Sequence, residues 1–388
     1  MRSTTTRKRL LPGAGRVLAS VAALALASLA SAQPERPERP PYRTSLFFVG
    51  GRYVGEGTAR RMAGQMYVQA FEPDRPTRPH PVVMIHGTGQ TGNNFLATAD
   101  GRPGWAHDFA ARGYRVYVVD QVGRGRSGTS SAAYGDYAAP ALPFVQLILG
   151  VPEAGLWPQV KLHTQWPGRM EPGDATFDQF MASQVEFVAD AARTEEINLP
   201  ANIALLERIG PAVVLTHSQA GVFGWKLGND RPDLVKALVA VEPNGPPFHD
   251  VAFHGGREWF RHSDAVARAS GITRLPLSFE PAAAEPTRPV LQERGDGPDL
   301  IPCWLQPEPA RRLPKLAGIP TVIVTGEASF RATYDHCTSR FLAQAGVPNT
   351  HLRLEAAGIR GNGHMMMMEK NSAEVAGAIA DWIEAKLR

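Results

Sequence analysis

The sequence lacks an internal repeat, a large excess of charge and any mark of a second independent domain. Charged residues make up only 20% of the 388 residues, whereas hydrophobic residues make up 43%. A chain of this composition can bury a substantial core, which argues against a disordered or fibrous protein. The sequence therefore predicts one large domain, and its 33 prolines indicate long loops between the regular elements.

A membrane-spanning apolar run is lacking near the start of the chain, where the apolar run is short. Residues 1–32 combine a basic start with an apolar run at 17–30 and an Ala30-Ser31-Ala32 cleavage pattern. These features predict a secretory signal peptide that is cleaved after Ala32, and hence a periplasmic or secreted protein. A retained N-terminal anchor is the alternative, although the run is too short for a comfortable membrane span. The choice between Sec and Tat export stays open.

The excess of basic charge disappears with that segment. The whole chain has 41 basic and 37 acidic residues, which gives a net charge of +4. Residues 1–32 hold five basic residues and no acidic one, so the mature chain has 36 basic and 37 acidic residues and a net charge of −1. The high isoelectric point of the full sequence therefore gives no support for nucleic-acid binding.

Cysteine is nearly absent, with only Cys303 and Cys337 in the whole chain. In an exported protein such a pair predicts a disulfide, and two unpaired buried thiols are the alternative. A bridge between them would close a loop of about 34 residues, for which the loop-entropy model assigns roughly 3–4 kcal/mol of stabilisation.

Strand-like and helix-like runs alternate through most of the chain, which is typical of an α/β fold. An extended lead-in at 33–44 precedes two early strands at 45–54 and 64–71, expected to form an antiparallel pair. Further strands are expected at 81–86, 114–120, 211–216, 235–241, 320–325 and 350–354, and helices at 105–112, from 218 onward and at 372–387. Because the later strands are continuous apolar runs, they predict a mostly parallel sheet with helices on both faces.

Two segments, at about 128–198 and 243–316, do not fit this alternation. Both are rich in proline, glycine and aromatic residues. Their size predicts insertions that form a lid or cap above the sheet, within a single domain at 45–388.

The segment PAVVLTHSQAGVFGW at 211–225 places a serine directly after an apolar strand and at the start of a helix. This is the context of the nucleophile elbow of hydrolases, whose usual pattern is G-x-S-x-G. Both glycines are missing around Ser218, where Thr216 and Ala220 stand instead. Ala220 is small, Thr216 occupies a position that does not need a positive φ, and Gly221 still permits close packing of helix on strand. Taken alone, the segment leaves a helix-capping serine as the alternative.

The loop HGTG at 86–89 follows the strand at 81–86 and matches the H-G-x-G loop that supplies an oxyanion donor. The backbone N–H groups of Thr88 and Gln219 are the predicted pair of oxyanion donors. An ordinary glycine turn is the alternative. The segment DQVGRGRSG at 120–128 resembles a turn of the same fold and predicts a structural role only.

The general base is expected late in the chain. His364 ends the segment GNGH at 361–364, after the last expected strand, and agrees with the order nucleophile, acid, histidine. An exposed histidine without a role is the alternative. The methionines at 365–368 are interpreted as core or pocket packing rather than as a metal site.

Three carboxylates compete for the acid of the triad, which must orient the histidine. Glu327 and Asp335 follow the strand at 320–325, where the acid most often lies in α/β-hydrolases. Glu242 ends the strand at 235–241, at the edge of the sheet where ligand-facing residues gather.

The segments HGTGQTG, VDQVGRGRS, THSQAG, VAVEPNG and GNGHMMM together resemble a group of exported bacterial α/β-hydrolase esterases. The resemblance covers about 45–388 and weakens in the two insertions. It implies an α/β-hydrolase fold and a Ser–His–Glu triad, which would be Ser218, His364 and Glu242. The resemblance therefore favours Glu242 over Glu327 and Asp335.

Together these features predict a serine hydrolase that cleaves carboxylic esters of small molecules through an acyl-enzyme. The chemistry needs no metal or organic cofactor. An amidase, a lactonase or an acyltransferase with the same triad, and a non-catalytic binding protein on the hydrolase scaffold, are the alternatives. No nucleic-acid partner and no stable membrane span are expected. The oligomeric state stays open, with a homodimer as one option.

Overall fold

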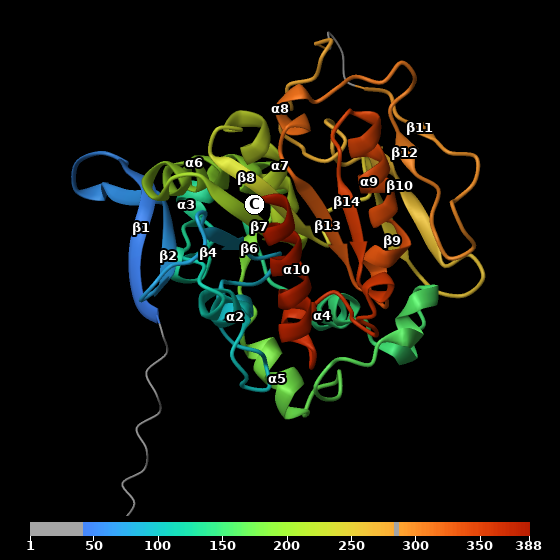
Figure 1. Ribbon diagram of the computed structural model, residues 1–388, viewed down its shortest axis with the longest axis horizontal. Coiled ribbons are helices and arrows are strands. Elements are labelled where there is room, and N and C mark those ends of the chain that lie inside the picture. Colours follow the sequence, from blue (N-terminus) through green and yellow to red (C-terminus); the bar gives the residue numbers. More distant parts are fainter. Residues whose placement is uncertain (1–41, 283–286) are drawn as a thin grey trace, which may run out of the picture. The chain divides into compact units, whose positions relative to one another are not determined.

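The computed structural model describes residues 42–282 and 287–388 of the chain (Figure 1). The predicted signal peptide at 1–32 and most of the lead-in lie outside the described residues. The first strand begins at Tyr42, so the last residues of the expected lead-in already belong to the sheet. In the described ranges no helix is both long and apolar enough to cross a membrane.

An eight-stranded sheet forms the centre of the described chain, in the order β1-β2-β4-β3-β7-β8-β13-β14. In that order the strands are β1 (Tyr42–Val54), β2 (Arg61–Pro73), β4 (Val116–Asp120), β3 (Val82–Ile85), β7 (Ala212–His217), β8 (Val235–Val241), β13 (Thr321–Thr325) and β14 (Thr350–Arg353). β1 pairs with β2 and β2 with β4 in antiparallel fashion, whereas the strands from β4 to β14 are parallel. The predicted hairpin and mostly parallel sheet are confirmed.

The helices connect and cover the strands of this sheet. They are α1 (Asn93–Leu96), α2 (Trp105–Ala111), α3 (Ser131–Tyr134), α4 (Leu142–Leu149), α5 (Ala175–Ala182), α6 (Ala191–Ile209), α7 (Gly221–Asp230), α8 (Pro314–Ala317), α9 (Asp335–Gln344) and α10 (Ser372–Lys386). Short 3₁₀ turns are η1 (Gly57–Ala59), η2 (Gly125–Ser127), η3 (Pro152–Ala154), η4 (Pro158–Leu162), η5 (Ser218–Ala220), η6 (Phe330–Thr333), η7 (Leu354–Ala357) and η8 (Met366–Met368).

The core divides into two layers, one on each face of the sheet. Alternate residues of a strand point to opposite faces, so Val82 and Met84 of β3 join one layer, and Val83 and Ile85 join the other. Helices α2 and α10 pack on the first face, and α6, α7 and α9 pack on the second. Figure 1 shows α10 lying across one face of the sheet. Helices on both faces confirm the predicted α/β architecture.

Helix α6 is absent from the elements expected from the sequence, and it begins inside the first expected insertion. Pro200 lies in its interior, and its buried face includes the polar residues Asn198 and Asn202, which break the apolar pattern of a helix. Asn198 Oδ1 accepts a hydrogen bond from Val122 N at 2.7 Å, so the buried amide is satisfied. Because α6 packs on β1 and β2, the helix belongs to the main fold and the first insertion ends before it.

The rest of the two insertions consists of short helices, 3₁₀ turns and short strands joined by loops. Two-stranded ribbons are formed by β5 (Tyr137–Ala138) with β6 (Phe187–Val188), β9 (His249–Phe253) with β10 (Phe260–Val266), and β11 (Val290–Leu291) with β12 (Trp304–Leu305). Side chains of α4, from the first insertion, and of β9, from the second, line the same cavity at the ends of the parallel strands. Both insertions therefore help to enclose the candidate site.

Candidate active site

Ser218 follows β7 directly and has a left-handed backbone, with φ of 55°. Residues other than glycine seldom adopt this conformation, and it persists where the surrounding structure requires it. A helix-capping serine would instead have an extended backbone, and that position here belongs to His217, with φ of −118° and ψ of 135°. Ser218 thus has the strained turn of a nucleophile elbow.

Of the two missing glycines of the elbow, the first is not needed here and the role of the second falls to Gly221. Thr216 is not among the described residues with positive φ, and Ala220 is fully buried. A Cβ on Gly221 would lie 2.7 Å from Pro243 Cβ, so the chain approaches too closely there for any side chain. The close approach that the second glycine of the motif usually permits therefore occurs one residue later.

His364 and Glu242 come together from two different strand ends. Glu242 follows β8 with φ of 46°, and His364 lies in the loop between β14 and α10. His364 Nδ1 is 2.5 Å from Glu242 Oε2, and both side chains are buried. Glu242 also accepts hydrogen bonds from Gly326 N at 2.7 Å and from Ser329 Oγ at 2.6 Å. Three donors therefore converge on this carboxylate.

Burial dominates the electrostatics of this pair. Burial lowers the pKa of His364 well below its ordinary value, and the neighbouring His217 lowers it further. Burial, and then the nearby carboxyl of Asp335, raise the pKa of Glu242, while the donors from Ser329 and Gly326 oppose that rise. A neutral imidazole is the form that can accept a proton, so the site suits His364 as a base at neutral pH.

The two other acid candidates lie elsewhere. Glu327 accepts from Arg360 Nη1 at 2.7 Å and from Gly361 N at 2.9 Å, so it steadies the loop before His364. Asp335 accepts from Thr325 Oγ1 at 2.7 Å, and burial raises its pKa to about 7. Of the three carboxylates, Glu242 is the one that the structure brings into hydrogen-bonding contact with His364.

Ser218 and His364 line one cavity of about 210 Å³, together with the predicted oxyanion residues Thr88 and Gln219. Within the described chain, Ser218 Oγ is not in hydrogen-bonding geometry with His364, and its contact is Arg331 Nη2 at 3.5 Å. Catalytic hydrogen bonds of this kind often tighten only when a substrate binds. The four residues thus share the space in which a reacting carbonyl would sit.

Arg124 joins the predicted oxyanion loop to the turn that carries Ser218. Its buried guanidinium donates from Nη1 to Gly87 O at 2.8 Å and from Nη2 to Gln219 Oε1 at 2.7 Å. A Cβ on Gly87 would lie 2.9 Å from Ser218 Cβ, so the loop approaches the serine closely. The pattern of 120–128 predicts a structural turn only, and nothing in it indicates this contact of Arg124.

A second buried carboxylate, Glu369, holds the loop that carries His364. Glu369 accepts from Gly363 N at 2.8 Å and from Asn362 Nδ2 at 2.7 Å. His163, from the first insertion, lies 2.9 Å from Glu369 Oε1 through Nε2. Although burial alone would lower it, the hydrogen bond and charge of Glu369 raise the pKa of His163. The insertion and the histidine loop therefore meet at one carboxylate.

His217 supports His364 from the other side. Its Nε2 is 3.0 Å from His364 O, and the two ring centroids are 4.5 Å apart. Burial lowers the pKa of His217 to about 3, so the ring is neutral and Nε2 donates to the carbonyl. This positioning contact is another that the sequence motif does not reveal.

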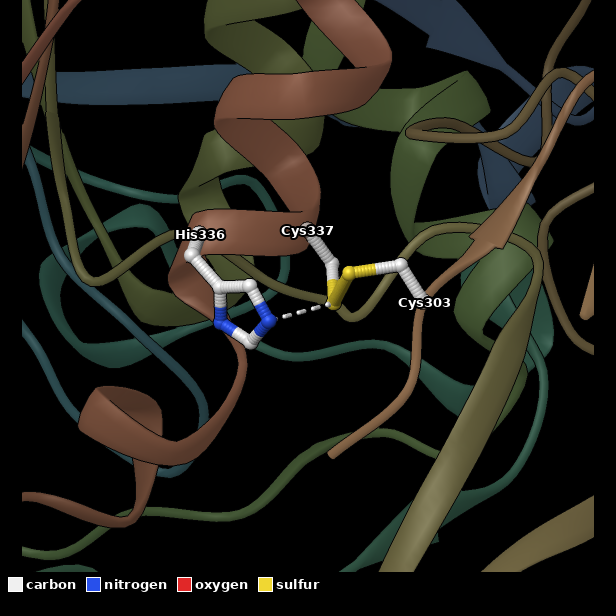
Figure 2. Close-up of side chains that lie close together, drawn as sticks. All are labelled: Cys303, His336 and Cys337. Carbon is white, nitrogen blue, oxygen red and sulfur yellow. Dashed lines mark hydrogen bonds between the residues drawn. A yellow bond between two sulfur atoms is a disulfide. The ribbon is translucent and has the colours of Figure 1, made fainter. Parts of the chain in front are cut away.

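Cys303 and Cys337 form a disulfide with an S–S distance of 2.08 Å, as the sequence predicts (Figure 2). The bridge joins the second insertion to α9, and His336 Nε2 lies 3.4 Å from Cys337 Sγ. The cluster has the residue types of a metal site, but both sulfurs are consumed by the bond and offer no thiolate. The methionines at 365–368 are buried in the core, which confirms their interpretation as packing residues.

The comparisons with known proteins agree with this architecture. Residues 82–378 match the model of the alpha/beta hydrolase family, and the chain therefore belongs to that family. The chain is 45% identical over 344 residues to "Probable secreted lipase phiG" of Fungal sp. (strain ATCC 74256), covering 88% of this chain and 89% of that protein. A solved structure, "The Atomic Resolution Structure of a Novel Bacterial Esterase", is similar in fold, with a TM-score of 0.60, 23% identity, and coverage of 89% of this chain and 96% of that one.

Proposed function

We propose that this protein is an exported serine esterase that hydrolyses carboxylic esters of small molecules. The observation that carries the proposal is the strained turn of Ser218 in one cavity with His364, whose Nδ1 lies 2.5 Å from Glu242. Membership of the hydrolase family, and a relative that is named a secreted lipase, support ester cleavage.

In the first half of the reaction, Ser218 Oγ attacks the carbonyl carbon of the ester while His364 takes the proton of Oγ. Glu242 accepts the Nδ1–H of His364 and stabilises the imidazolium that forms. The backbone N–H groups of Thr88 and Gln219 donate to the oxyanion. The tetrahedral intermediate collapses, and the alcohol leaves with the proton from His364, so that an acyl-enzyme remains.

In the second half of the reaction, a water molecule attacks the acyl-enzyme. His364 takes a proton from the water and returns it to Ser218 Oγ as the acid leaves. The sum is one ester and one water converted to one carboxylic acid and one alcohol. The cavity of about 210 Å³ favours small acyl groups, because ligand pockets for drug-sized molecules are generally larger, at roughly 300–1,000 Å³.

Export is supported by one observation and one sequence prediction, neither of which depends on the active site. The described chain holds its two cysteines in a disulfide, a bond that persists in oxidising compartments. The predicted signal peptide at 1–32 would take the chain across the membrane. We infer a periplasmic or secreted enzyme whose mature chain starts after Ala32.

The Ser218→Ala variant tests the proposal. Turnover of short p-nitrophenyl esters should fall on the order of 10⁴-fold or more, because the nucleophile acts as a unit with the base and acid. A fluorophosphonate probe should label the wild type and the exposed-residue control Ser131→Ala, but not Ser218→Ala. Undiminished turnover by Ser218→Ala, or equal labelling of both variants, would refute the assignment of the nucleophile.

A further inference from the structure

One buried arginine beside the nucleophile is left largely without partners. Arg331 lies on η6 and is only 5% exposed. Its Nη1 is 3.5 Å from Gly245 O and its Nη2 is 3.5 Å from Ser218 Oγ, whereas Nε is buried with no partner among the described residues. Ordinary N–H···O hydrogen bonds measure about 2.7–3.2 Å, so both contacts of the guanidinium are long.

Two other buried arginines, Arg124 and Arg268, have guanidinium groups that make short hydrogen bonds within the chain. Arg124 donates to two oxygens at 2.8 and 2.7 Å. Arg268 donates to Pro246 O at 2.6 Å, to His249 O at 3.0 Å and to Asp250 Oδ1 at 2.7 Å. Buried polar groups are nearly always satisfied, so an unsatisfied one calls for an explanation.

No carboxylate of the described ranges forms an ion pair with Arg331 within 4.0 Å. The rings of Phe330 and Tyr334 lie against the guanidinium, with its Cζ 4.8 and 5.3 Å from their centroids. Such stacking fixes the plane of a guanidinium while it leaves the N–H donors free. Burial raises the pKa of Glu242 and of Asp335, and the charge of Arg331 opposes that rise from a distance without pairing with either carboxylate.

The guanidinium opens onto the cavity that Ser218 and His364 line. Apolar side chains form much of the remaining wall, among them Phe144, Leu147, Ile148, Val251 and Phe330. The other charged group on this wall, Asp250, is already paired with Arg268 at 2.7 Å. The cavity therefore presents one uncompensated positive charge next to the nucleophile, opposite an apolar surface.

We propose that Arg331 binds a carboxylate of the substrate, so that the enzyme prefers esters that carry a second, ionised carboxylate within a few bonds of the scissile carbonyl. Half-esters of short dicarboxylic acids have this chemistry. The inference rests on the proposed esterase function and specifies its substrate class. The planar guanidinium of arginine can donate two parallel hydrogen bonds to one carboxylate. A carboxylate would therefore use the free donors of Arg331 better than a group that accepts a single hydrogen bond.

The reaction balances as before, with the second carboxylate as a spectator. Ser218 Oγ forms the acyl bond while the bond to the alcohol oxygen breaks, and water then releases a dicarboxylate. The carboxylate on Arg331 keeps its charge throughout and orients the scissile carbonyl over Ser218. Orientation of this kind favours the transition state because it removes freedom that would otherwise be lost during reaction.

A purely electrostatic role of Arg331 makes a different prediction. If the charge served only to keep Glu242 ionised, every ester would suffer equally when it is removed. A substrate-binding role predicts an additional loss for esters with the second carboxylate, beyond any loss that neutral esters share. The discriminating quantity is therefore a ratio of kcat/KM values rather than a single rate.

The experiment compares monoethyl succinate with ethyl succinamate, a neutral ester of nearly the same shape, by the release of ethanol. The wild type should favour the half-ester, and Arg331→Gln should reduce this preference on the order of 10²-fold, as is usual when one partner of a buried charge pair is removed. Arg331→Lys should retain part of the preference. The exposed control Arg353→Gln, at 61% side-chain exposure, should retain all of it. An unchanged preference in Arg331→Gln would overturn the proposal.

A second measurement needs neither a variant nor turnover of the half-ester. Succinate should bind the wild type in calorimetry and inhibit hydrolysis of a neutral ester, at concentrations about 10-fold or more below those needed for succinamate. Equal binding of the two would also overturn the proposal. Failure of the esterase function itself would look different, because no ester would be cleaved and no fluorophosphonate would label Ser218.

Discussion

The two sides of the cavity around Ser218 are held together in different ways. On one side, the carboxylate of Glu242 accepts hydrogen bonds of 2.5 to 2.7 Å from His364, Ser329 and Gly326. On the other side, the guanidinium of Arg331 makes contacts no shorter than 3.5 Å. On the first side, the chain itself supplies the hydrogen-bond donors of the carboxylate, as the positioning of a base requires. On the second side, the guanidinium keeps N–H donors that no close acceptor of the described chain satisfies.

Replacement of Glu242 by glutamine should have the largest effect and tests whether the first side is the catalytic one. An amide cannot accept from all three donors or stabilise an imidazolium, so kcat should fall on the order of 10³–10⁴-fold. Steady-state kinetics with a neutral ester measures the loss. The matched variants Glu327→Gln and Asp335→Asn should lose far less, and a greater loss in either of them would show that Glu242 is not the acid.

Removal of the disulfide tests how the second side of the cavity is supported. The bond joins the second insertion to α9, the helix that follows η6 and its Arg331. The variant Cys303→Ser/Cys337→Ser should lose roughly 3–4 kcal/mol of unfolding free energy, because the unfolded chain regains the freedom of the closed loop. Urea denaturation of both proteins measures the difference. Equal midpoints and slopes would show that packing alone holds this wall.

The Ser329→Ala variant tests the first side more finely. It removes one of the donors to Glu242, at 2.6 Å, and leaves the contact with His364 in place. Loss of one hydrogen bond to a charged group costs about 1.5–3 kcal/mol, so kcat should fall roughly 10- to 10²-fold with little change in KM. Ser339→Ala, on α9, is the control, since its hydroxyl bonds Asn349 at 2.7 Å. A rise in KM with kcat unchanged would contradict a positioning role.

The pH profile gives the smallest change in rate and reports on the base. A protonated His364 cannot take the proton of Ser218, and burial lowers the pKa of His364 below its ordinary value of 6.5. The acid limb of kcat/KM should therefore lie below pH 6.5, as an apparent property of the coupled pair with Glu242. Because the unfolded chain protonates His364 more readily than the folded protein does, the lowered pKa also affects the free energy of unfolding. The folded protein is more stable above pH 6.5, and this stability is lost as the pH falls through the lower pKa of the folded state. An acid limb above pH 6.5 on a folded enzyme would contradict burial as the dominant effect.

Much of the first side could be predicted from the sequence. Continuous apolar runs mark the parallel strands, and the ends of neighbouring parallel strands meet at one edge of the sheet. Ser218 and Glu242 directly follow such strands, β7 and β8, whereas His364 lies in the loop between β14 and α10. The choice of Glu242 among three carboxylates came from the resemblance to known esterases, because strand order alone does not say which acid reaches His364.

The second side could not be predicted, and the reasons are physical. Arg331 lies in a short 3₁₀ turn without periodicity. Its proposed role follows from the scarcity of hydrogen-bond partners around its guanidinium, which only the folded structure reveals. Arg124 and Glu369 act through contacts with residues far along the chain, which leave no local pattern. Helix α6 could not be predicted because Pro200 and the buried Asn198 and Asn202 interrupt the apolar periodicity that would indicate a helix.

The contact between His163 and Glu369 joins the first insertion to the loop that carries His364. Glu369 accepts a hydrogen bond from Gly363, next to His364, and also contacts His163 of the first insertion. The first insertion therefore contributes to the position of the His364 loop. A graft that exchanged it for a foreign segment would leave Glu369 without its imidazole partner and free the backbone next to His364. A redesign that exchanges the cavity-lining segments would therefore have to retain His163, because the insertion that lines part of the cavity through α4 also supports the backbone next to His364.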